Sequence, residues 1–287
     1  MRVEILGAGN AGYSLGKAAR VAGNIVKVRP ARRELPTRPC RAELLIIAVR
    51  DSQIANMVQR LLLSSYLAPN LVCVHIAGAL GADVLADLRS RVRGVAQMHP
   101  LVSFACRRFV PRVKGATAIV NGDECANGVA RRFVRSLGMT PRTLVNMDTR
   151  RYHAAAALVS NGTAALAAQG AFILESAGFP KETLPAMLGP LLRSVAENID
   201  ELGFPNCLTG PVRRGDLGTV VGHLKAMSET SPESLMSYAV SALMQIRQAV
   251  AIGEASPETL KVLAEKLNDE ILQLISSPES APFRFRQ

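Results

Sequence analysis

The feature that most constrains the fold is a glycine-rich segment, Gly7–Gly12, near the start of the sequence. It follows an apolar stretch typical of a β-strand, Val3–Leu6, and opens a stretch typical of a helix, Asn10–Ala22. In such a strand–turn–helix the first glycine permits a tight turn, the second lets the backbone approach a pyrophosphate, and the third allows close helix–strand packing. The helix start adds free N–H groups and the positive end of the helix dipole. The sequence therefore predicts a dinucleotide-binding turn formed by Gly7, Ala8, Gly9, Asn10, Ala11 and Gly12.

Short apolar runs alternate with helix-like segments through the first half of the chain, as in βαβ units. Further strands are predicted at Ile25–Val28, Leu44–Val49, Leu71–Ile76, Val95–Met98 and Ala116–Val120. Their continuous apolar character indicates a sheet that is buried on both faces. Asp51 is expected to cap a helix over Ser52–Leu63, and a shorter helix is expected after the turn Gly78–Gly81. We therefore expect an α/β Rossmann-type domain over residues 1–147.

The strand signals stop near the middle of the chain, and helical patterns follow. Arg150–Ala177 is one long helical pattern, which ends just before a glycine. Two more helices are expected to begin at Ser231-Pro232-Glu233 and Ser256-Pro257-Glu258, where a capping serine precedes a proline and an acidic residue. Residues 148–287 are therefore predicted to form an all-α domain, with a loose tail from Ser276 onward.

The overall charge limits the classes of partner. The chain carries 34 Lys and Arg against 23 Asp and Glu, a formal net charge of +11. A basic surface can bind nucleic acid or attract anionic small molecules. The basic residues are dispersed, however, and the sequence has no Trp and only 4% aromatic residues, so a base-stacking surface is poorly supported. We expect no nucleic-acid partner.

Cysteine usage and hydropathy indicate the compartment. The five cysteines are scattered and form no Cys-x-x-Cys pair, which argues against a disulfide framework or a zinc site and favours a reducing compartment. Arg2 and Glu4 interrupt the first apolar run, so we expect no signal peptide. Ala154–Leu174 has no formal charge, but it is rich in alanine and contains polar residues, so we expect a helix buried inside the protein rather than a membrane span. These features predict a cytoplasmic protein with no metal site and no membrane association.

The residues that determine the cofactor preference are expected at the end of the second strand. NAD-binding proteins place an acidic residue on the ribose about 20 residues after the glycine motif. This sequence instead has three arginines there and no acid at the strand end, and guanidinium groups suit the additional 2′-phosphate of NADP. We therefore predict NADP as the cofactor, bound by an undetermined subset of Arg29, Arg32 and Arg33. The carboxyl ends of the next strands are predicted to contribute Val49, Arg50, Ala77 and Gly78.

Polar residues cluster in the helical half. At 100° per residue, His153, Ser160 and Asn161 share one broad face of an alanine-rich helix. Arg214 and Asp216 follow in a later loop. A cap, a helix–helix hydrogen bond or a structural ion pair could explain each of them separately. Together, behind a dinucleotide-binding domain, they favour a site for a substrate.

These residues also carry a family resemblance that covers nearly the whole chain. The chain resembles bacterial reductases that join a Rossmann-like domain to a helical C-terminal domain long described as of unknown function. Within that group it is similar to the alternative ketopantoate reductases. The matching segments are Gly7–Gly12, Ala48-Val49-Arg50-Asp51, His75–Gly81, His99-Pro100-Leu101 with Ser103-Phe104, Tyr152–Ala156, Ser160-Asn161, Pro190-Leu191, Asn198, Leu208–Asp216, Thr219 and His223-Leu224.

The resemblance implies a helical domain like that of 6-phosphogluconate dehydrogenase, a homodimer, and a reductase of pantothenate biosynthesis. One departure concerns the proton donor. The related 3-hydroxyacid dehydrogenases and standard ketopantoate reductases place Lys and Asn four residues apart on the first long helix of this domain. Here Ala157 stands four residues before Asn161, and the helix contains no lysine. His153 is therefore the candidate acid.

The sequence thus predicts NADPH-dependent reduction of ketopantoate, or of a similar 2-oxo acid, to the 2-hydroxy acid. Histidine changes charge near neutral pH, so we assign His153 to proton donation, and Asn161 with Ser160 to the developing oxyanion. Arg214 is expected to bind the substrate carboxylate, with Asp216 either orienting it or capping the next helix. His99 and His223 are second choices for the acid. Two alternatives remain open: a reductase of cyclic imines of the pyrroline-carboxylate type, and an NADPH-binding sensor or regulatory protein without turnover.

Overall fold

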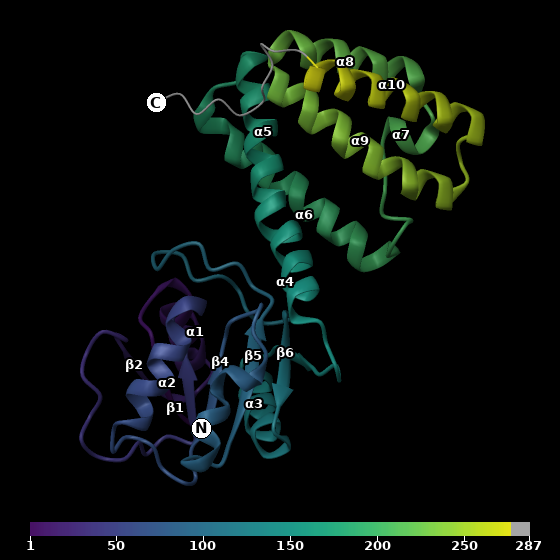
Figure 1. The fold of residues 1–287 in the computed structure, drawn as a ribbon. Helices are drawn as coiled ribbons and strands as arrows, with labels where there is room; N and C mark the ends of the chain where they lie inside the picture. The colour runs from purple at the N-terminus through teal and green to yellow at the C-terminus, as the bar shows by residue number, and fades with distance from the viewer. Residues whose placement is uncertain (277–287) are drawn as a thin grey trace. The chain divides into compact units, whose positions relative to one another are not determined.

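The computed structural model describes residues 1–276, and the predicted loose tail beyond Ser276 lies outside them. The chain divides into two compact units: an N-terminal unit, Met1–Ser160, and a C-terminal unit from Asn161 onward. Each unit has its own hydrophobic core. The predicted fold class, a Rossmann-type domain followed by an all-α domain, is confirmed (Figure 1).

The N-terminal unit is built on one seven-stranded sheet with the order β2-β1-β3-β4-β5-β6-β7. The first five strands pair in parallel, β6 is antiparallel to β5, and β7 is parallel to β6. The bounds are β1 Arg2–Leu6, β2 Ile25–Arg29, β3 Leu44–Ile47, β4 Val72–His75, β5 Gly94–Pro100, β6 Thr117–Gly122 and β7 Thr140–Arg142. In this order the carboxyl ends of β1, β3, β4 and β5 share one edge, where ligands of open α/β sheets bind.

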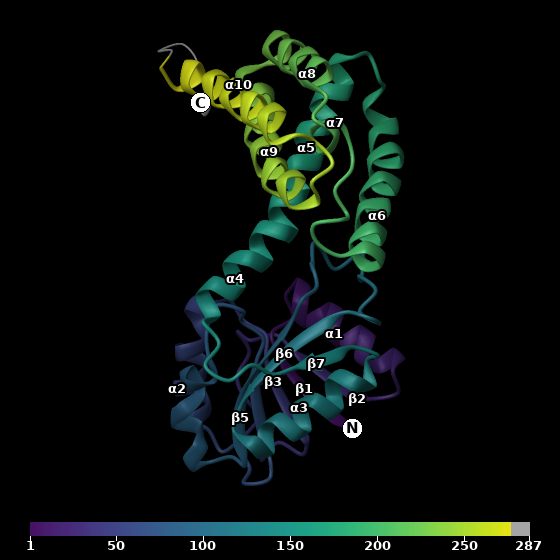
Figure 2. The ribbon, with the colours of Figure 1, turned by 90° about the vertical axis from the view of Figure 1, so that its right-hand side faces the viewer.

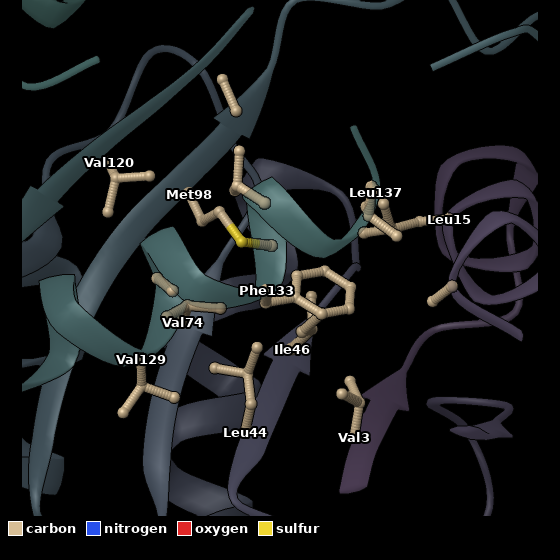
Figure 3. Close-up of a cluster of buried hydrophobic side chains, with 14 of the residues drawn as sticks. Val3, Leu15, Leu44, Ile46, Val74, Met98, Val120, Val129, Phe133 and Leu137 are labelled. Carbon is tan, nitrogen blue, oxygen red and sulfur yellow. The ribbon is translucent and has the colours of Figure 1, made fainter. Parts of the chain in front are cut away.

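Side chains of successive strand residues alternate between the two faces of the sheet, and each face has its own helices. Helices α1 (Asn10–Val21) and α3 (Glu124–Ser136) pack on one face, where Phe133 lies among apolar strand residues (Figure 3). Helix α2 (Ile54–Leu62) and a 3₁₀-helix, η2 (Ala82–Ser90), pack on the other. The long apolar runs of β3 and β4 are buried on both faces, as predicted.

Two elements were not predicted, and one predicted cap is wrong. Helix α3 was not predicted, although its inner face is buried and its outer face carries several charged residues. Strand β7 has only three residues and contains Pro141, so it has too little pattern to be recognised (Figure 2). Asp51 does not cap the predicted helix. It lies within a 3₁₀ turn, η1 (Asp51–Gln53), so α2 begins only at Ile54, too far along the chain for that carboxylate to cap it.

The predicted long helix is present as three consecutive parts. Helix α4 (Thr149–Ala157) is capped by Asp148, whose carboxylate accepts from the N–H groups of Arg150 and Arg151 at 3.1 and 3.0 Å. A π-helical turn, η3 (Leu158–Gly162), follows, and α5 (Thr163–Ser176) completes the helix. The helix ends before Gly178, whose φ of +96° suits a glycine.

The expected burial of this helix is wrong for the chain by itself. Residues 149–176 are all described, and none of them is buried. By length and composition, this helix and Pro232–Ile252 could each cross a bilayer, with mean hydropathies of 1.4 and 1.2. Two such helices are weak evidence for a membrane protein, because core helices of soluble proteins pass the same test. Within residues 1–276 its alanine-rich surface is therefore not covered by other elements.

The C-terminal unit is helical throughout its described part. Its further helices are α6 (Leu184–Leu202), α7 (Pro211–Arg214), α8 (Leu217–Thr230), α9 (Pro232–Ile252) and α10 (Pro257–Ser276), preceded by a 3₁₀ turn, η4 (Lys181–Thr183). Helices α7 to α10 enclose the core, whereas α6 lies to one side of them (Figure 2). Both predicted serine caps are confirmed: Ser231 Oγ accepts from the N–H of Ser234 at 3.0 Å, and Ser256 Oγ accepts from that of Thr259 at 3.2 Å.

Candidate active site

The glycine turn has the geometry that its sequence predicts. Gly7 has a φ of +126°, and a Cβ there would overlap the carbonyl of Ala48. A Cβ on Gly12 would overlap the carbonyl of Gly7, so only glycine allows α1 to approach the turn this closely. A Cβ on Gly9, by contrast, would meet no atom of the described chain within 4 Å. Gly9 thus leaves open space beside the backbone, as approach of a pyrophosphate requires.

The start of α1 is suited to an anion. Within residues 1–276 no side chain caps this helix, and its first turn contains no acidic residue. Its first N–H groups therefore remain available to phosphate oxygens. Asn10 lies on this first turn and directs its amide elsewhere, because Nδ2 donates to the carbonyl of Ala105 at 2.7 Å. That bond brings the loop after β5 beside the glycine turn.

The three arginines predicted to select NADP lie in different surroundings. Arg29 forms an ion pair with the buried carboxylate of Glu4, so its charge is already matched within the sheet. Arg32 and Arg33 are exposed on the loop that follows β2. Arg60 of α2, which sequence analysis missed, donates to the carbonyls of Ala31 and Arg33 at 2.5 and 2.8 Å. It fixes the backbone that carries the two exposed guanidinium groups.

The next strand ends line the same edge of the sheet. Val49 is half-buried after β3, and Arg50 is exposed immediately before the turn η1. Ala77 and Gly78 are buried after β4. All four predicted contact residues thus lie on the carboxyl edge, together with the glycine turn.

Two buried polar side chains hold the turn after β4, and sequence analysis assigned a role to neither. His75 Nδ1 accepts from the N–H of Ala77 at 3.2 Å, so Nε2 carries the proton and donates to the carbonyl of Gly81 at 3.0 Å. Gln97 of β5 donates to the carbonyls of Ala77 and Gly78 at 3.0 and 3.2 Å. Burial lowers the pKa of His75, although its bond to Gly81 and the charge of Asp51 oppose the shift. The turn is therefore held by a neutral imidazole.

Three ring side chains meet at this turn. His99 is the last residue but one of β5, and its Nδ1 lies 2.6 Å from the hydroxyl of Tyr152 on α4. The rings of His99 and His153 stand edge to face with centroids 5.9 Å apart. A Cβ on Gly78 would overlap the His153 ring and lie 2.8 Å from His99 Nε2. Glycine at this position is what lets both histidines lie against the turn.

The electrostatics of this cluster favour neutral side chains. Burial lowers the pKa of His99 to about 4, and the charge of His153 adds to the shift while Asp51 opposes it. Burial raises the pKa of Tyr152 to about 12. At neutral pH His99 is therefore an uncharged imidazole and Tyr152 an intact phenol.

Ser160 and Asn161 lie in the π-helical turn η3, both exposed. Ser160 Oγ donates to the carbonyl of Ala156 at 2.8 Å. Single π-helical turns inside α-helices occur frequently at functional sites, because the extra residue changes which side chains share a face. The regular 100° spacing used for the sequence prediction does not hold across this turn.

The remaining candidates lie in the C-terminal unit. Arg214 ends α7 and is exposed. Asp216 takes the second of its two predicted roles: it caps α8, accepting from the N–H of Thr219 at 3.0 Å and from its hydroxyl at 2.6 Å. His223 is exposed, with its Nδ1 2.8 Å from the hydroxyl of Tyr238. Among residues 1–276 no group of three or more His, Cys, Asp or Glu side chains is placed to hold a metal ion.

The fold defines the class: a protein with a Rossmann-like N-terminal domain and an all-helical second domain. Residues 1–100 match the Rossmann-like domain, and residues 116–245 match a domain of unknown function, DUF2520. The chain therefore joins a Rossmann-like domain to a DUF2520 domain, and its resemblance to that group of reductases is confirmed. A comparison with curated proteins finds no match by sequence.

Solved structures share this fold over most of the chain. Protein TM1727 from Thermotoga maritima is 21% identical, with a TM-score of 0.63 over 87% of this chain and 98% of its own. A Bacteroides fragilis protein assigned to the NADP oxidoreductases is 20% identical, with a TM-score of 0.66 over 85% and 97%. Plasmodium falciparum pyrroline carboxylate reductase, solved with NADP bound, is 13% identical, with a TM-score of 0.56 over 94% and 98%. At these identities the likeness establishes the fold.

Proposed function

We propose that this protein is an NADPH-dependent reductase that converts ketopantoate, or a closely similar 2-oxo acid, to the 2-hydroxy acid. The observation that carries the proposal is the meeting of His99 and His153 at Gly78, with Tyr152 bonded to His99, on the same sheet edge as the glycine turn. Phosphate-binding geometry and proton-transfer groups on one edge are what a nicotinamide-dependent reduction requires.

NADPH held at the glycine turn would supply a hydride to the carbonyl carbon of the substrate. The N–H groups at the start of α1 would hold the pyrophosphate, and Arg32 and Arg33 would bind the 2′-phosphate. The fit rests on two features of this chain: the open space at Gly9 and the uncapped first turn of α1 within the described residues. Arg29 is assigned to Glu4 rather than to the cofactor.

The carbonyl oxygen gains negative charge as the hydride arrives, and it must receive a proton. We assign the proton to the imidazolium of His153, which becomes neutral as the alcohol forms and is reprotonated by solvent. Asn161, with Ser160, is assigned to hydrogen bonding of the developing oxyanion. Arg214 is assigned to the substrate carboxylate, because a guanidinium can bind a carboxylate through two parallel hydrogen bonds.

Reduction of an imine is the second candidate. The neighbours that favour it are the Plasmodium pyrroline carboxylate reductase and an Aspergillus terreus reductive aminase solved with NADPH and ethyl levulinate, which is 15% identical with a TM-score of 0.51 over 95% of this chain and 94% of its own. Both chemistries need a hydride donor and an acid beside the reacting carbon. They differ in whether the acceptor is an oxygen or a nitrogen.

One assay separates these candidates. Purified protein is mixed with NADPH and, in turn, ketopantoate, other 2-oxo acids, pyrroline-5-carboxylate and linear imines, and loss of NADPH absorbance is followed at several pH values. We expect turnover with ketopantoate and a marked preference for NADPH over NADH. Turnover of imines alone would replace the substrate assignment. Binding of NADPH without turnover of any compound would instead support a sensor or regulatory protein.

A further inference from the structure

The contact between Tyr152 and His99 has a chemical consequence for the proposed reaction. The hydroxyl lies 2.6 Å from Nδ1, a short hydrogen bond, and the two rings stand perpendicular with centroids 5.5 Å apart. An imidazole nitrogen is a better acceptor than a phenol oxygen, so the phenol donates and Nδ1 accepts. The proton of a neutral His99 must then reside on Nε2.

The Nε2 atom of His99 is directed toward the carboxyl edge of the sheet. It would lie 2.8 Å from a Cβ on Gly78, which places it against the turn that follows β4 and beside the ring of His153. Within residues 1–276, the titratable groups that act on His99 are Tyr152 and His153 from α4, His75 from β4, and Asp51 from the turn after β3. His75 is held as the same neutral tautomer by its own two bonds.

We propose that Tyr152 is a positioning residue that holds His99 as the Nε2–H tautomer, and that this N–H donates a hydrogen bond to the carbonyl oxygen that His153 protonates. Two histidines at one glycine then perform different tasks: one is an uncharged donor and the other is the acid. A carbonyl oxygen next to two donors becomes more electrophilic at its carbon, and its developing charge is stabilised in the transition state. This inference rests on the proposed function, since it names a further residue of the same site.

The spectroscopic test does not depend on activity. The sequence contains only four histidines, so long-range ¹H–¹⁵N spectra of labelled protein can be assigned with single-histidine variants. We expect His99 to show a protonated Nε2 and an unprotonated Nδ1 at neutral pH, and Tyr152→Phe to convert it to a mixture of tautomers. A protonated Nδ1 in the wild-type protein, or no change in Tyr152→Phe, overturns the inference.

The chain contains a matched control. His223 and Tyr238 repeat the arrangement, with Nδ1 and the hydroxyl 2.8 Å apart and perpendicular rings at 5.4 Å. Tyr238→Phe removes the equivalent hydroxyl in the C-terminal unit. We expect it to alter the nitrogen signals of His223 and to leave those of His99 unchanged.

The kinetic test uses the N–H donor itself. His99→Leu removes the donor and should lower kcat roughly 10²–10³-fold, the range for loss of one oxyanion donor. His99→Gln retains a side-chain N–H, so its kcat should be at least tenfold higher than that of His99→Leu. Equal kcat values for the wild type and His99→Leu would overturn the inference while leaving the proposed function in place. Absence of turnover by wild-type protein with a correct His99 tautomer would overturn the proposed function and, with it, the role of His99 as a donor to the carbonyl.

Discussion

The hydroxyl of Thr149 donates a hydrogen bond of 3.1 Å to the carbonyl of Ala79, and this bond ties the first turn of α4 to the turn that follows β4. Tyr152 and His153 follow on the same helix, so the bond helps to place His153 at Gly78 and Tyr152 at His99. The same bond is consistent with the place of α4 in the N-terminal compact unit. The elements change from α/β to all-α after β7, yet α4 belongs to the N-terminal unit.

Gly78→Ala should disrupt the cluster at this turn. The new Cβ would overlap the His153 ring and crowd His99, so the rings must move apart and the reacting oxygen loses aligned donors. We expect kcat to fall about 10²-fold, as small displacements in active sites do, with destabilisation of roughly 1–3 kcal/mol from overpacking. Gly81→Ala is the control, because a Cβ there meets no atom of the described chain within 4 Å. Similar kcat values for both variants would argue against the assigned site.

Replacing Arg32 and Arg33 together with Gln should weaken NADPH binding and leave NADH binding nearly unchanged. A charge-assisted bond to the 2′-phosphate contributes about 1.5–3 kcal/mol, which corresponds to roughly 10–100-fold in Kd. Titration of both cofactors by fluorescence measures the effect. Arg38→Gln, at another exposed arginine of the same loop, is the control. Equal losses for NADPH and NADH would contradict the assignment of the 2′-phosphate.

Steady-state kinetics should separate the roles of His153 and Arg214. His153→Ala should reduce kcat about 10²–10⁴-fold with little change in KM, because a general acid acts only in the transition state. Arg214→Ala should mainly raise KM, because a carboxylate is bound equally in the ground and transition states. NADPH affinity should survive both changes. A His153→Ala enzyme with near-normal kcat across the pH range would assign His153 a packing role.

Acidification should destabilise the N-terminal unit. The pKa of His99 is lowered to about 4 by burial, whereas a histidine in the unfolded chain titrates near 6.5, so below that pH the unfolded state binds more protons. Stability is therefore complete above about pH 6.5 and falls toward pH 4, by roughly 1–2 kcal/mol at pH 5 for this one group. Thermal unfolding measured at pH 6.5 and at pH 5 should show a smaller loss of stability on acidification for His99→Gln than for the wild type. His223→Gln, at an exposed histidine, should behave like the wild type.

We propose that a second copy of this chain covers the apolar surface of α5 and α6. Large hydrophobic side chains are exposed along these helices and their flanking turns, namely Leu158, Val159, Leu166, Phe172, Phe179, Met187, Leu191, Leu192, Val195, Ile199, Leu202 and Phe204. An apolar groove of about 600 Å³ also lies between α5 and α6. A concentration of exposed apolar side chains marks an interaction site, and the same surface on two copies can meet across a twofold axis.

Light scattering at micromolar concentration should give the mass of a dimer. Leu191→Glu should yield a monomer, because it buries a charge at the contact, while Leu272→Glu at a similarly exposed position on α10 should not. A monomeric wild type would contradict the proposal. Flotation with phospholipid vesicles would assign the surface to a membrane instead.

The sequence by itself determined the elements whose signals are local. The glycine turn was correct because Gly7 and Gly12 leave no room for any other side chain, a requirement written directly into residue type. The buried parallel strands and the caps at Ser231 and Ser256 were correct for the same reason, since periodicity and capping chemistry involve only neighbouring residues.

Only the tertiary structure decided which polar groups meet. Glu4 and Arg29 are 25 positions apart, and their ion pair leaves Arg32 and Arg33 as the exposed arginines of the predicted three. His99 and Tyr152 are separated by 53 positions, and no local pattern connects the end of β5 with the second turn of α4. The π-helical turn at Ser160 and Asn161 likewise broke the regular spacing from which their common face was inferred. Pairings of this kind depend on strand order and helix placement, which are set by packing of the whole core rather than by adjacent residues.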